Sequence, residues 1–270
     1  MNRISLASGV VPEFGPVETI RAAAAGGFDS VGLWIEPPTW TRSIEQECRA
    51  ALSGTGLEVL DVEVVWFKPG AADPNHCRCL DIGAALGARN VLVVSSDPDM
   101  AANAAKLAAL CEHAQPLGLR ICLEFGVFTE IKTIGQALAV IAAANHPVAG
   151  LLIDPLHLAR SGGSPADVAR VSRDRLPYAQ FCDAPAQGPL PTDADGILRE
   201  ALDERLQTGE GQLPLRALLS ALPGGVPLSI ELRSKALRDR WADPGERALA
   251  TAQATRRFLT AVSHGQAQQQ

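Results

Sequence analysis

Oxygen-bearing side chains interrupt four apolar segments in the second half of the sequence. Glu124 ends ICLEF, Asp154 ends GLLID, Gln180 lies in YAQFCD and Glu231 lies in LSIEL. A carboxylate inside an apolar strand costs free energy unless it is paired or bound to a metal. Three carboxylates and an amide oxygen are hard ligands that suit Mg²⁺ or Mn²⁺, and suit Zn²⁺ less well. The alternative at each position is a buried hydrogen bond or an ion pair with a nearby arginine.

Further polar and aromatic residues lie close to the ends of apolar segments. Glu63 interrupts DVEVVWF and could be a second acid or base, or a paired core carboxylate. Arg233 and Lys235 follow Glu231 and could bind an anionic group of a substrate or remain solvated, which fits Lys235 better. Trp66, like Trp34, could wall a pocket against water, although packing in the core is the simpler interpretation.

Two kinds of segment must position these residues. Short apolar runs predict strands, and the stretches between them are rich in good helix formers. The predicted strands are Arg3–Ala7, Ser30–Ile35, Glu58–Trp66, Asn90–Val94, Arg120–Phe125, Gly150–Ile153, Tyr178–Phe181 and Pro227–Leu232. The predicted helices are Pro16–Ala25, Arg42–Ser53, Asn75–Leu86, Met100–Leu117, Thr133–Ala144, Pro165–Leu176, Leu213–Leu222 and Glu246–Val262.

Eight strand–helix pairs in 270 residues predict an α/β protein with the single-domain (β/α)8 TIM barrel fold. A doubly wound open sheet is the structural alternative, but it usually has fewer strands, and the first turn, SGVVPEFG, lacks a GxGxxG motif. Barrel active sites lie at the C-terminal ends of the strands, so the four oxygen-bearing residues should converge there on one divalent ion. We predict the barrel over residues 1–264 and a disordered polar tail over 265–270.

The composition excludes several classes of protein. Disorder is excluded because 47% of the residues are hydrophobic and only 20% are charged. The formal charge of −6 argues against nucleic-acid binding, which needs a dense basic surface. No apolar run approaches the ~18 residues of a spanning helix, and the start of the chain shows no secretory signal. The six cysteines are therefore expected to be reduced thiols of a cytoplasmic protein.

The sequence resembles the sugar phosphate isomerase/epimerase family of xylose isomerase-like TIM barrels over nearly its whole length. The motifs that carry this resemblance are AAAAGGFDSVGLW, LEF, IDPLH, QFCDA, GEG and SIEL. In that family the fifth to eighth strands supply Glu, Asp, His or Gln, and Glu to one divalent metal, which matches Glu124, Asp154, Gln180 and Glu231 here. The expected cofactor is one Mn²⁺ or Mg²⁺ ion, with Co²⁺ as a third candidate.

The resemblance also implies roles for residues near the metal. His157 would face the substrate as a hydrogen-bond donor or proton carrier, whereas a lone histidine is more often structural. Family members carry a similar Arg and Gly-x-Gly loop near the substrate, here Arg205 and the loop around Glu210, which could instead be exposed and flexible. Asp183 either holds a basic side chain or caps the next helix. The predicted substrate-binding residues are His157, Arg205, Glu63, Trp66 and Arg233.

The predicted site suits proton transfer next to a carbonyl. A metal ion there could chelate the carbonyl and its neighbouring hydroxyl and stabilise an enediolate. Glu124 and Glu231 are the predicted proton donor and acceptor, with His157 as a third catalytic residue. Returning the proton gives an isomerase or epimerase, which we place first, and expelling a β-hydroxyl gives a dehydratase of the inosose or 3-dehydroshikimate type. Sugar 3-epimerases of the family usually carry His where this chain has Gln180, and Gln resembles the dehydratases.

The expected partner is a small polyhydroxy carbonyl substrate, without nucleic acid or membrane, and a homodimer is the assembly considered. Apurinic endonucleases share the barrel but use several metal ions and many histidines, whereas this chain has five histidines. A non-catalytic binding barrel would bind no metal with micromolar or better affinity.

Overall fold

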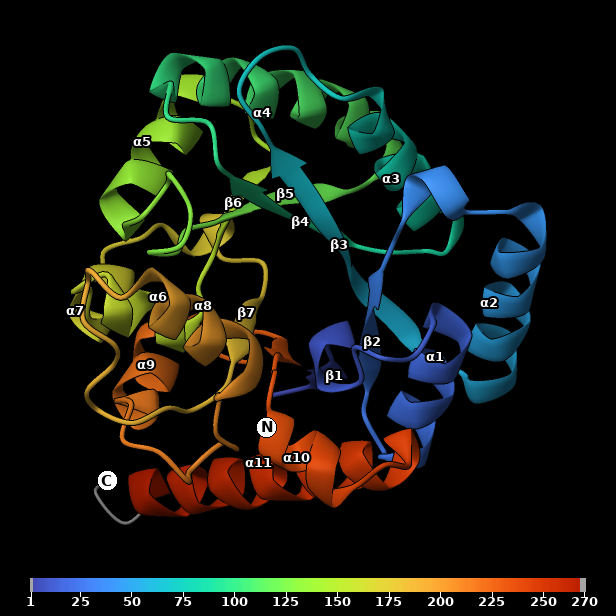
Figure 1. Ribbon diagram of the computed structural model, residues 1–270, viewed down its shortest axis with the longest axis vertical. Coiled ribbons are helices and arrows are strands. Elements are labelled where there is room, and N and C mark those ends of the chain that lie inside the picture. The colour runs from blue at the N-terminus through green and yellow to red at the C-terminus, as the bar shows by residue number, and fades with distance from the viewer. Residues whose placement is uncertain (1, 268–270) are drawn as a thin grey trace.

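Eight parallel strands form the barrel of the computed structural model, which describes residues 2–267 (Figure 1). Their order in the sheet is β6-β5-β4-β3-β2-β1-β8-β7, and a parallel bridge between Ile153 and Ala179 joins the two ends. The predicted TIM barrel and all eight predicted strands are thereby confirmed. The strands are β1 (Ile4–Leu6), β2 (Ser30–Trp34), β3 (Glu58–Phe67), β4 (Asn90–Ser95), β5 (Arg120–Glu124), β6 (Ala149–Leu152), β7 (Ala179–Phe181) and β8 (Leu228–Ile230).

Helices surround the barrel on its outside (Figure 1). They are α1 (Pro16–Ala25), α2 (Arg42–Thr55), α3 (Pro74–Ala85), α4 (Met100–Ala114), α5 (Ile134–Ala144), α6 (Pro155–Arg160), α7 (Pro165–Val168), α8 (Ala194–Asp203), α9 (Leu215–Ala221), α10 (Lys235–Arg240) and α11 (Pro244–Ala267). Short 3-10 turns add η1 (Ser8–Val10), η2 (Pro37–Thr39), η3 (Gln115–Leu117) and η4 (Arg173–Arg175).

Local sequence sets where several of these helices begin and end. Thr133 and Gln136 form a reciprocal capping box at the start of α5, and Asn145 ends that helix in the left-handed conformation at φ 47°. Thr41 accepts a hydrogen bond from the Ile44 amide at the start of α2. These caps satisfy backbone groups that would otherwise lack partners within the helix.

The prediction of one helix over Pro165–Leu176 is wrong for most of its length, because only α7 is α-helical there and the turn η4 follows it. The Ser172 hydroxyl donates to the Asp174 carboxylate, a local bond that competes with helix formation. The sequence also missed α6, α8 and α10. The helix α11 continues to Ala267, and residues 268–270 of the predicted tail lie outside the described residues.

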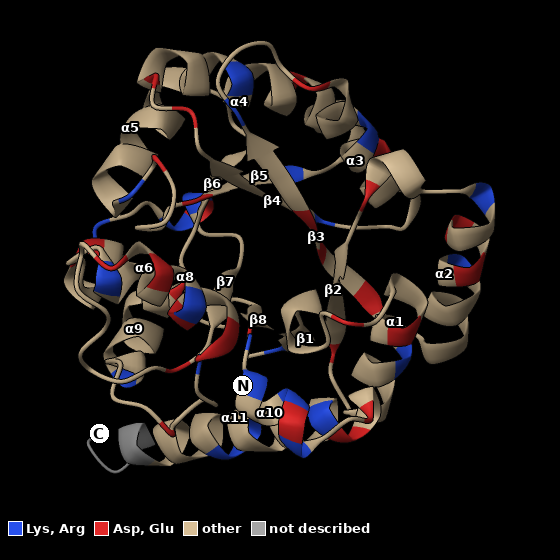
Figure 2. Ribbon diagram, in the orientation of Figure 1, with Lys and Arg blue, Asp and Glu red and all other residues tan. Residues whose placement is uncertain are grey.

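The apolar residues divide between two layers. The larger cluster packs the helices against the outside of the barrel. A smaller one fills part of its interior and consists of Leu60, Leu92, Val94, Cys122, Leu152 and Tyr178. Figure 2 shows acidic and basic residues interspersed on the outer helices, for example on α2, rather than separated by sign. The apolar packing therefore holds a rigid ring of strands whose ends present the polar residues.

The structure of residues 2–267 bears on two predictions made from composition, which concern the cysteines and membrane-spanning helices. All six cysteines are unpaired thiols, as predicted. None of the helices in this range is both long enough and apolar enough to cross a membrane.

Candidate metal and substrate site at the mouth of the barrel

The four predicted metal ligands meet at the C-terminal ends of neighbouring strands. Glu124 is the last residue of β5, Asp154 follows β6 and caps α6, Gln180 lies within β7, and Glu231 directly follows β8. All four are buried. The strand order places them side by side around one half of the barrel, which is the convergence that the sequence predicts.

Glu124, Asp154 and His157 each offer a ligand atom, and these atoms lie within 4.8 Å of one another. His157 reaches this position because Asp154 caps α6 through the amides of Leu156 and His157, so the histidine lies on the first turn of the helix. The sequence predicted His157 as a catalytic and substrate-binding residue and not as a metal ligand. The Asp-x-x-His spacing at a strand end is the signal that could have found it.

Unpartnered polar atoms mark the same place. Oε1 of Glu124 and both amide atoms of Gln180 are buried, and none has a hydrogen-bond partner within residues 2–267. A buried polar group without a partner carries a desolvation cost, and such groups usually bind an ion, water or ligand. The two oxygens, Oε1 of Glu124 and Oε1 of Gln180, therefore fit a divalent cation held by hard oxygen ligands, and Nε2 of Gln180 is left to donate to a ligand or water.

Arginines engage the other two predicted ligands. Nη1 of Arg205 donates to Oδ2 of Asp154 at 2.5 Å, and Nη2 lies 3.6 Å from Oε2 of Glu231. Nε of Arg233 donates to Oε1 of Glu231 at 3.2 Å. The alternative considered for the sequence, pairing with arginine, thus holds for Asp154 and Glu231. Each carboxylate oxygen has two lone pairs, so these contacts leave capacity for a metal.

Burial and charge shift the pKa values of the cluster in different directions. Burial raises the pKa of Glu124 well above its usual value, and the negative charges of Glu231 and Asp154 raise it further. Burial alone would also raise the pKa of Asp154, but Arg205 and His157 hold it below its usual value. Burial lowers the pKa of His157, which keeps the imidazole neutral at neutral pH.

The formal charges at the mouth do not balance. The groups are four carboxylates and two guanidinium groups: Glu63, Glu124, Asp154, Glu231, Arg205 and Arg233. With all of them ionised, two negative charges remain uncompensated in a region of low dielectric, where that is costly. A single dication would compensate them.

A cavity of about 190 Å³ opens beside this cluster. Its lining includes Glu124 and Glu231 and brings together all five predicted substrate-binding residues, which are Glu63, Trp66, His157, Arg205 and Arg233. Phe128, which is not among the predicted site residues, also lines the cavity, with its ring centroid 5.1 Å from that of His157. Its place in the FGVF segment directly after the Glu124 strand was the available signal. The cavity has an acidic side and an apolar side.

Three other polar residues considered in the sequence, Glu63, Asp183 and Lys235, have hydrogen-bond or ion-pair partners. The Ser8 hydroxyl donates to Glu63, so this carboxylate is both paired and open to the cavity. Asp183 takes neither predicted role, because its oxygens accept hydrogen bonds from the backbone amides of Ala184, Gly209 and Leu213. It thereby anchors the loop around Glu210. Lys235 pairs with Asp239 on the surface, as its solvated interpretation requires.

The fold and this acidic mouth define a class of protein. Residues 20–260 match the model of the family described as xylose isomerase-like TIM barrel, and the chain belongs to this family. The resemblance inferred from the sequence is confirmed.

Two curated relatives narrow the comparison. The chain is 25% identical over 255 residues to a 3-dehydroshikimate dehydratase of Pseudomonas putida, strain KT2440, and 26% identical over 249 residues to a 3-dehydroshikimate dehydratase of Pseudomonas aeruginosa, strain PAO1. Each match covers 86% of this chain but 37% of the relative. The chain therefore spans little more than a third of the length of these relatives.

Solved structures show the same fold. The crystal structure of the IOLI protein with a bound zinc atom superposes with a TM-score of 0.78 at 16% identity, covering 96% of this chain and 97% of that one. A D-allulose 3-epimerase from Methylomonas sp. superposes with a TM-score of 0.69 at 17% identity, covering 95% and 98%. Proteins similar to this chain therefore include enzymes: the two curated relatives are dehydratases, and a 3-epimerase shares the fold.

Proposed function

We propose that this chain is a divalent-metal-dependent lyase that dehydrates a cyclic polyhydroxy ketone of the 3-dehydroshikimate kind. The observation that carries the proposal is the buried group of Glu124, Asp154 and His157, with the unpartnered amide of Gln180, beside a cavity at the barrel mouth. The two curated relatives support dehydration, which was the second prediction from the sequence after isomerisation. Gln180 at the position where 3-epimerases usually carry His supports the same choice.

Glu124, Asp154, Gln180 and Glu231 would hold the ion, and His157 lies beside them. Mn²⁺ and Mg²⁺ fit this oxygen-rich set, with Co²⁺ as a further candidate. When bound, the ion supplies Lewis acidity that polarises the substrate carbonyl and its neighbouring hydroxyl.

The protein's own groups would then move the protons. A carboxylate at the mouth, Glu231 in our assignment, removes the proton from the carbon next to the carbonyl. Glu124, the predicted proton donor, delivers a proton to the β-hydroxyl, which leaves as water. His157 stays neutral and accepts a hydrogen bond at Nε2 from Arg205 at 3.3 Å, so it is placed to orient a substrate hydroxyl. Phe128 and Trp66 form part of the apolar wall of the cavity beside these groups.

An isomerase or epimerase is the second candidate, and the similarity to D-allulose 3-epimerase in fold favours it. It shares the first proton abstraction and differs only in where the proton returns. The two functions are therefore separated by product and not by site geometry.

The test is incubation of the metal-loaded protein in D₂O with 3-dehydroshikimate, inososes and keto-sugars, followed by mass spectrometry. The proposal predicts loss of one water from a cyclic ketone. Deuterium at carbon without loss of water would establish the isomerase instead. If none of these compounds either loses water or gains deuterium, both candidate functions are refuted.

A further inference from the structure

Asp61 is a buried carboxylate that the proposed chemistry does not use. It lies in β3 and is 1% exposed. Its one side-chain hydrogen bond within residues 2–267 comes from the hydroxyl of Tyr178, which donates to Oδ2 at 3.4 Å. No lysine, arginine or histidine in this range pairs with Asp61, and its Oδ1 has no partner. A fully buried aspartate is rarely left without a cation, so this one needs an explanation.

Two features of the neighbouring strands turn this carboxylate into the barrel. The register between β2 and β3 shifts, so that Asp61 and not Leu60 pairs with Gly32. Because of this β-bulge both Leu60 and Asp61 face inward, where Leu60 packs in the interior cluster and Asp61 meets Tyr178. Gly32 makes room for the carboxylate, since a Cβ at that position would come within 2.8 Å of Oδ1 of Asp61.

Two serine hydroxyls share this part of the interior. Ser5 of β1 and Ser229 of β8 are Cα partners on adjacent strands, and both are fully buried. The residues on either side of each serine belong to the outer apolar cluster, so both hydroxyls face inward. Neither Oγ has a hydrogen-bond partner in the part of the chain that the structure describes. Since β1 lies next to β2, and Gly32 of β2 faces Asp61, the three unpartnered oxygens lie on the same side of the interior.

Small residues line this side of the barrel. Ser229, Ser5 and Gly32 come from the consecutive strands β8, β1 and β2, whereas larger residues of the interior cluster fill the side formed by β4, β5 and β6. Barrel interiors are ordinarily filled by bulky branched side chains. The small side chains therefore leave room for a small ligand beside Oδ1 of Asp61.

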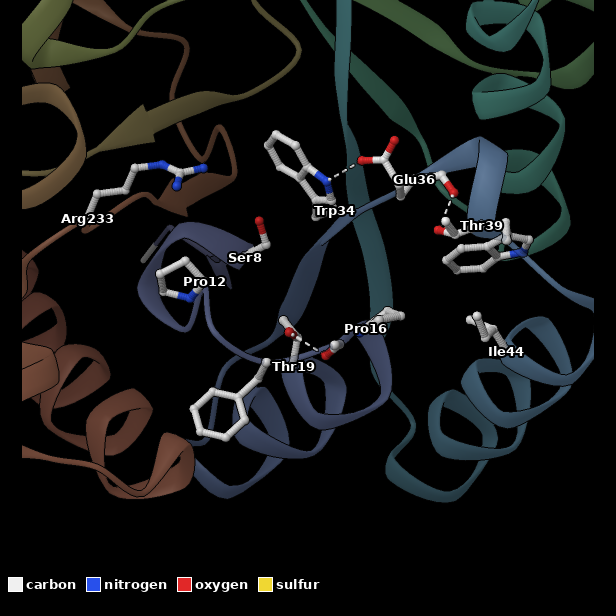
Figure 3. A pocket seen from close by; sticks show the side chains of 12 residues that line it. Ser8, Pro12, Pro16, Thr19, Trp34, Glu36, Thr39, Ile44 and Arg233 are labelled. Atoms are coloured by element: carbon white, nitrogen blue, oxygen red, sulfur yellow. Dashed lines mark hydrogen bonds between the residues drawn. The ribbon is translucent and has the colours of Figure 1, made fainter. Parts of the chain in front are cut away.

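Glu63, the next inward carboxylate of β3, shows what a partner does. Burial raises the pKa of Glu63, but the Arg233 guanidinium and the hydroxyl of Ser8, which donates to it, oppose that shift. Ser8 and Arg233 both line a larger cavity of about 310 Å³, which Figure 3 shows. Asp61 has no such cation: burial and the negative charges of Glu63 and Glu231 raise its pKa well above the usual value.

We propose that Asp61, Ser5 and Ser229 bind one monovalent alkali cation, Na⁺ or K⁺, inside the barrel. Its charge has the required size, because a dication at the mouth leaves only the charge of Asp61 uncompensated. A cation contacts all three oxygens at once, whereas a proton on Asp61 serves only one of them and water brings no charge. Tyr178 precedes Gln180 by two residues, so the cation lies one side-chain layer below the predicted metal ligands. This site does not depend on the proposed lyase activity.

Thermal unfolding of the Mn²⁺-loaded protein in different chloride salts at equal ionic strength tests the proposal. Mn²⁺ keeps the site at the mouth occupied, and tetramethylammonium is too large to enter the barrel interior. Sodium or potassium chloride should raise the unfolding temperature by about 3 °C over tetramethylammonium chloride, the shift for a cation about tenfold above its Kd. The larger shift identifies the preferred ion, and sodium NMR relaxation with K⁺ as competitor measures binding directly.

Two variants locate the site. Asp61→Asn keeps the shape of the side chain and removes its charge, so its unfolding temperature should be the same in all three salts. Ser229→Ala removes one ligand oxygen and should raise the half-saturating cation concentration about tenfold, which tests the site even where Asp61→Asn does not fold. Asp239→Asn and Ser43→Ala, on exposed helix faces, are the matched controls and should keep the full shift.

Three results would overturn the proposal. The first is an equal unfolding temperature of the parent in all three salts, which a protonated Asp61 would give. The second is a shift that persists in Asp61→Asn, and the third is an unchanged half-saturating concentration in Ser229→Ala.

Discussion

Arg205 and Asp154 form a buried ion pair across the mouth of the barrel. Nη1 of Arg205 lies 2.5 Å from Oδ2 of Asp154, and the two side chains are 3% and 0% exposed. Arg205 lies between α8 and α9, and Asp154 follows β6. The pair therefore joins the segment after α8 to the rigid strand ends. The same arginine contacts Glu231 and His157. Its loss should therefore affect both the free energy of unfolding and the residues predicted to bind substrate.

Arg205→Ala should destabilise the metal-free protein by about 3–5 kcal/mol, because it leaves Asp154 as an uncompensated buried charge. Urea unfolding measures this change. Arg3→Ala removes a half-exposed pair with Glu58 and should cost no more than about 1 kcal/mol. If the Arg205 variant were as stable as the Arg3 variant, the buried pair would not have the role assigned to it. On the proposed substrate, Arg205→Ala should also raise KM.

Chelation should abolish activity, and Mn²⁺ or Mg²⁺ should restore it. The loss follows because the carbonyl is no longer polarised, and thermal unfolding should shift to lower temperature as the ligand is removed. Full activity of the chelated protein, verified metal-free by elemental analysis, would disprove the metal-dependent mechanism.

Gln180→Leu tests one predicted ligand by a readout other than activity. The change removes two buried polar atoms that have no partner within residues 2–267, so the metal-free protein should lose no stability. Its affinity for Mn²⁺, measured by calorimetry, should fall at least about tenfold, as expected for loss of one ligand. Gln46→Leu on the exposed face of α2 is the control. Unchanged affinity in Gln180→Leu would remove that residue from the ligand set.

Glu231→Gln should keep the fold and lower turnover by about 10²–10⁴, the usual contribution of a positioned acid or base. Circular dichroism and steady-state kinetics check the two parts of this expectation. Glu246→Gln on α11 makes the same change outside the site and should retain full activity. A Glu231 variant as active as the parent would exclude this residue from catalysis.

Glu124→Gln should stabilise the metal-free protein at neutral pH. Burial raises the pKa of Glu124 in the folded state above the ordinary 4.5, so its protonated form favours folding at acid pH and this contribution is lost as the pH rises through the folded-state pKa. The neutral amide carries no such loss. Unfolding free energies between pH 4.5 and 8 should therefore diverge as the pH rises, with the variant the more stable. A difference that does not vary with pH would contradict the assignment.

The sequence by itself was sufficient to predict the barrel fold and the four strand ends that carry Glu124, Asp154, Gln180 and Glu231. These predictions succeeded because strands of a parallel barrel are buried on both faces, so a polar residue at such a strand end stands out against an apolar run. Helices shorter than two turns, such as α6 and α10, left no comparable periodicity and were missed.

Only the tertiary structure decided how the polar groups are shared. No local pattern could show that Arg205 reaches Asp154, 51 residues away. Nor could it show that His157 lies in the same cluster as Glu124 and Asp154. Nor could it show that Asp183 binds a loop backbone and that Trp40 is left with a free indole N–H among the described residues. Pairing of buried charges depends on which side chains meet across the barrel, and that is set by packing of distant segments and not by spacing along the chain.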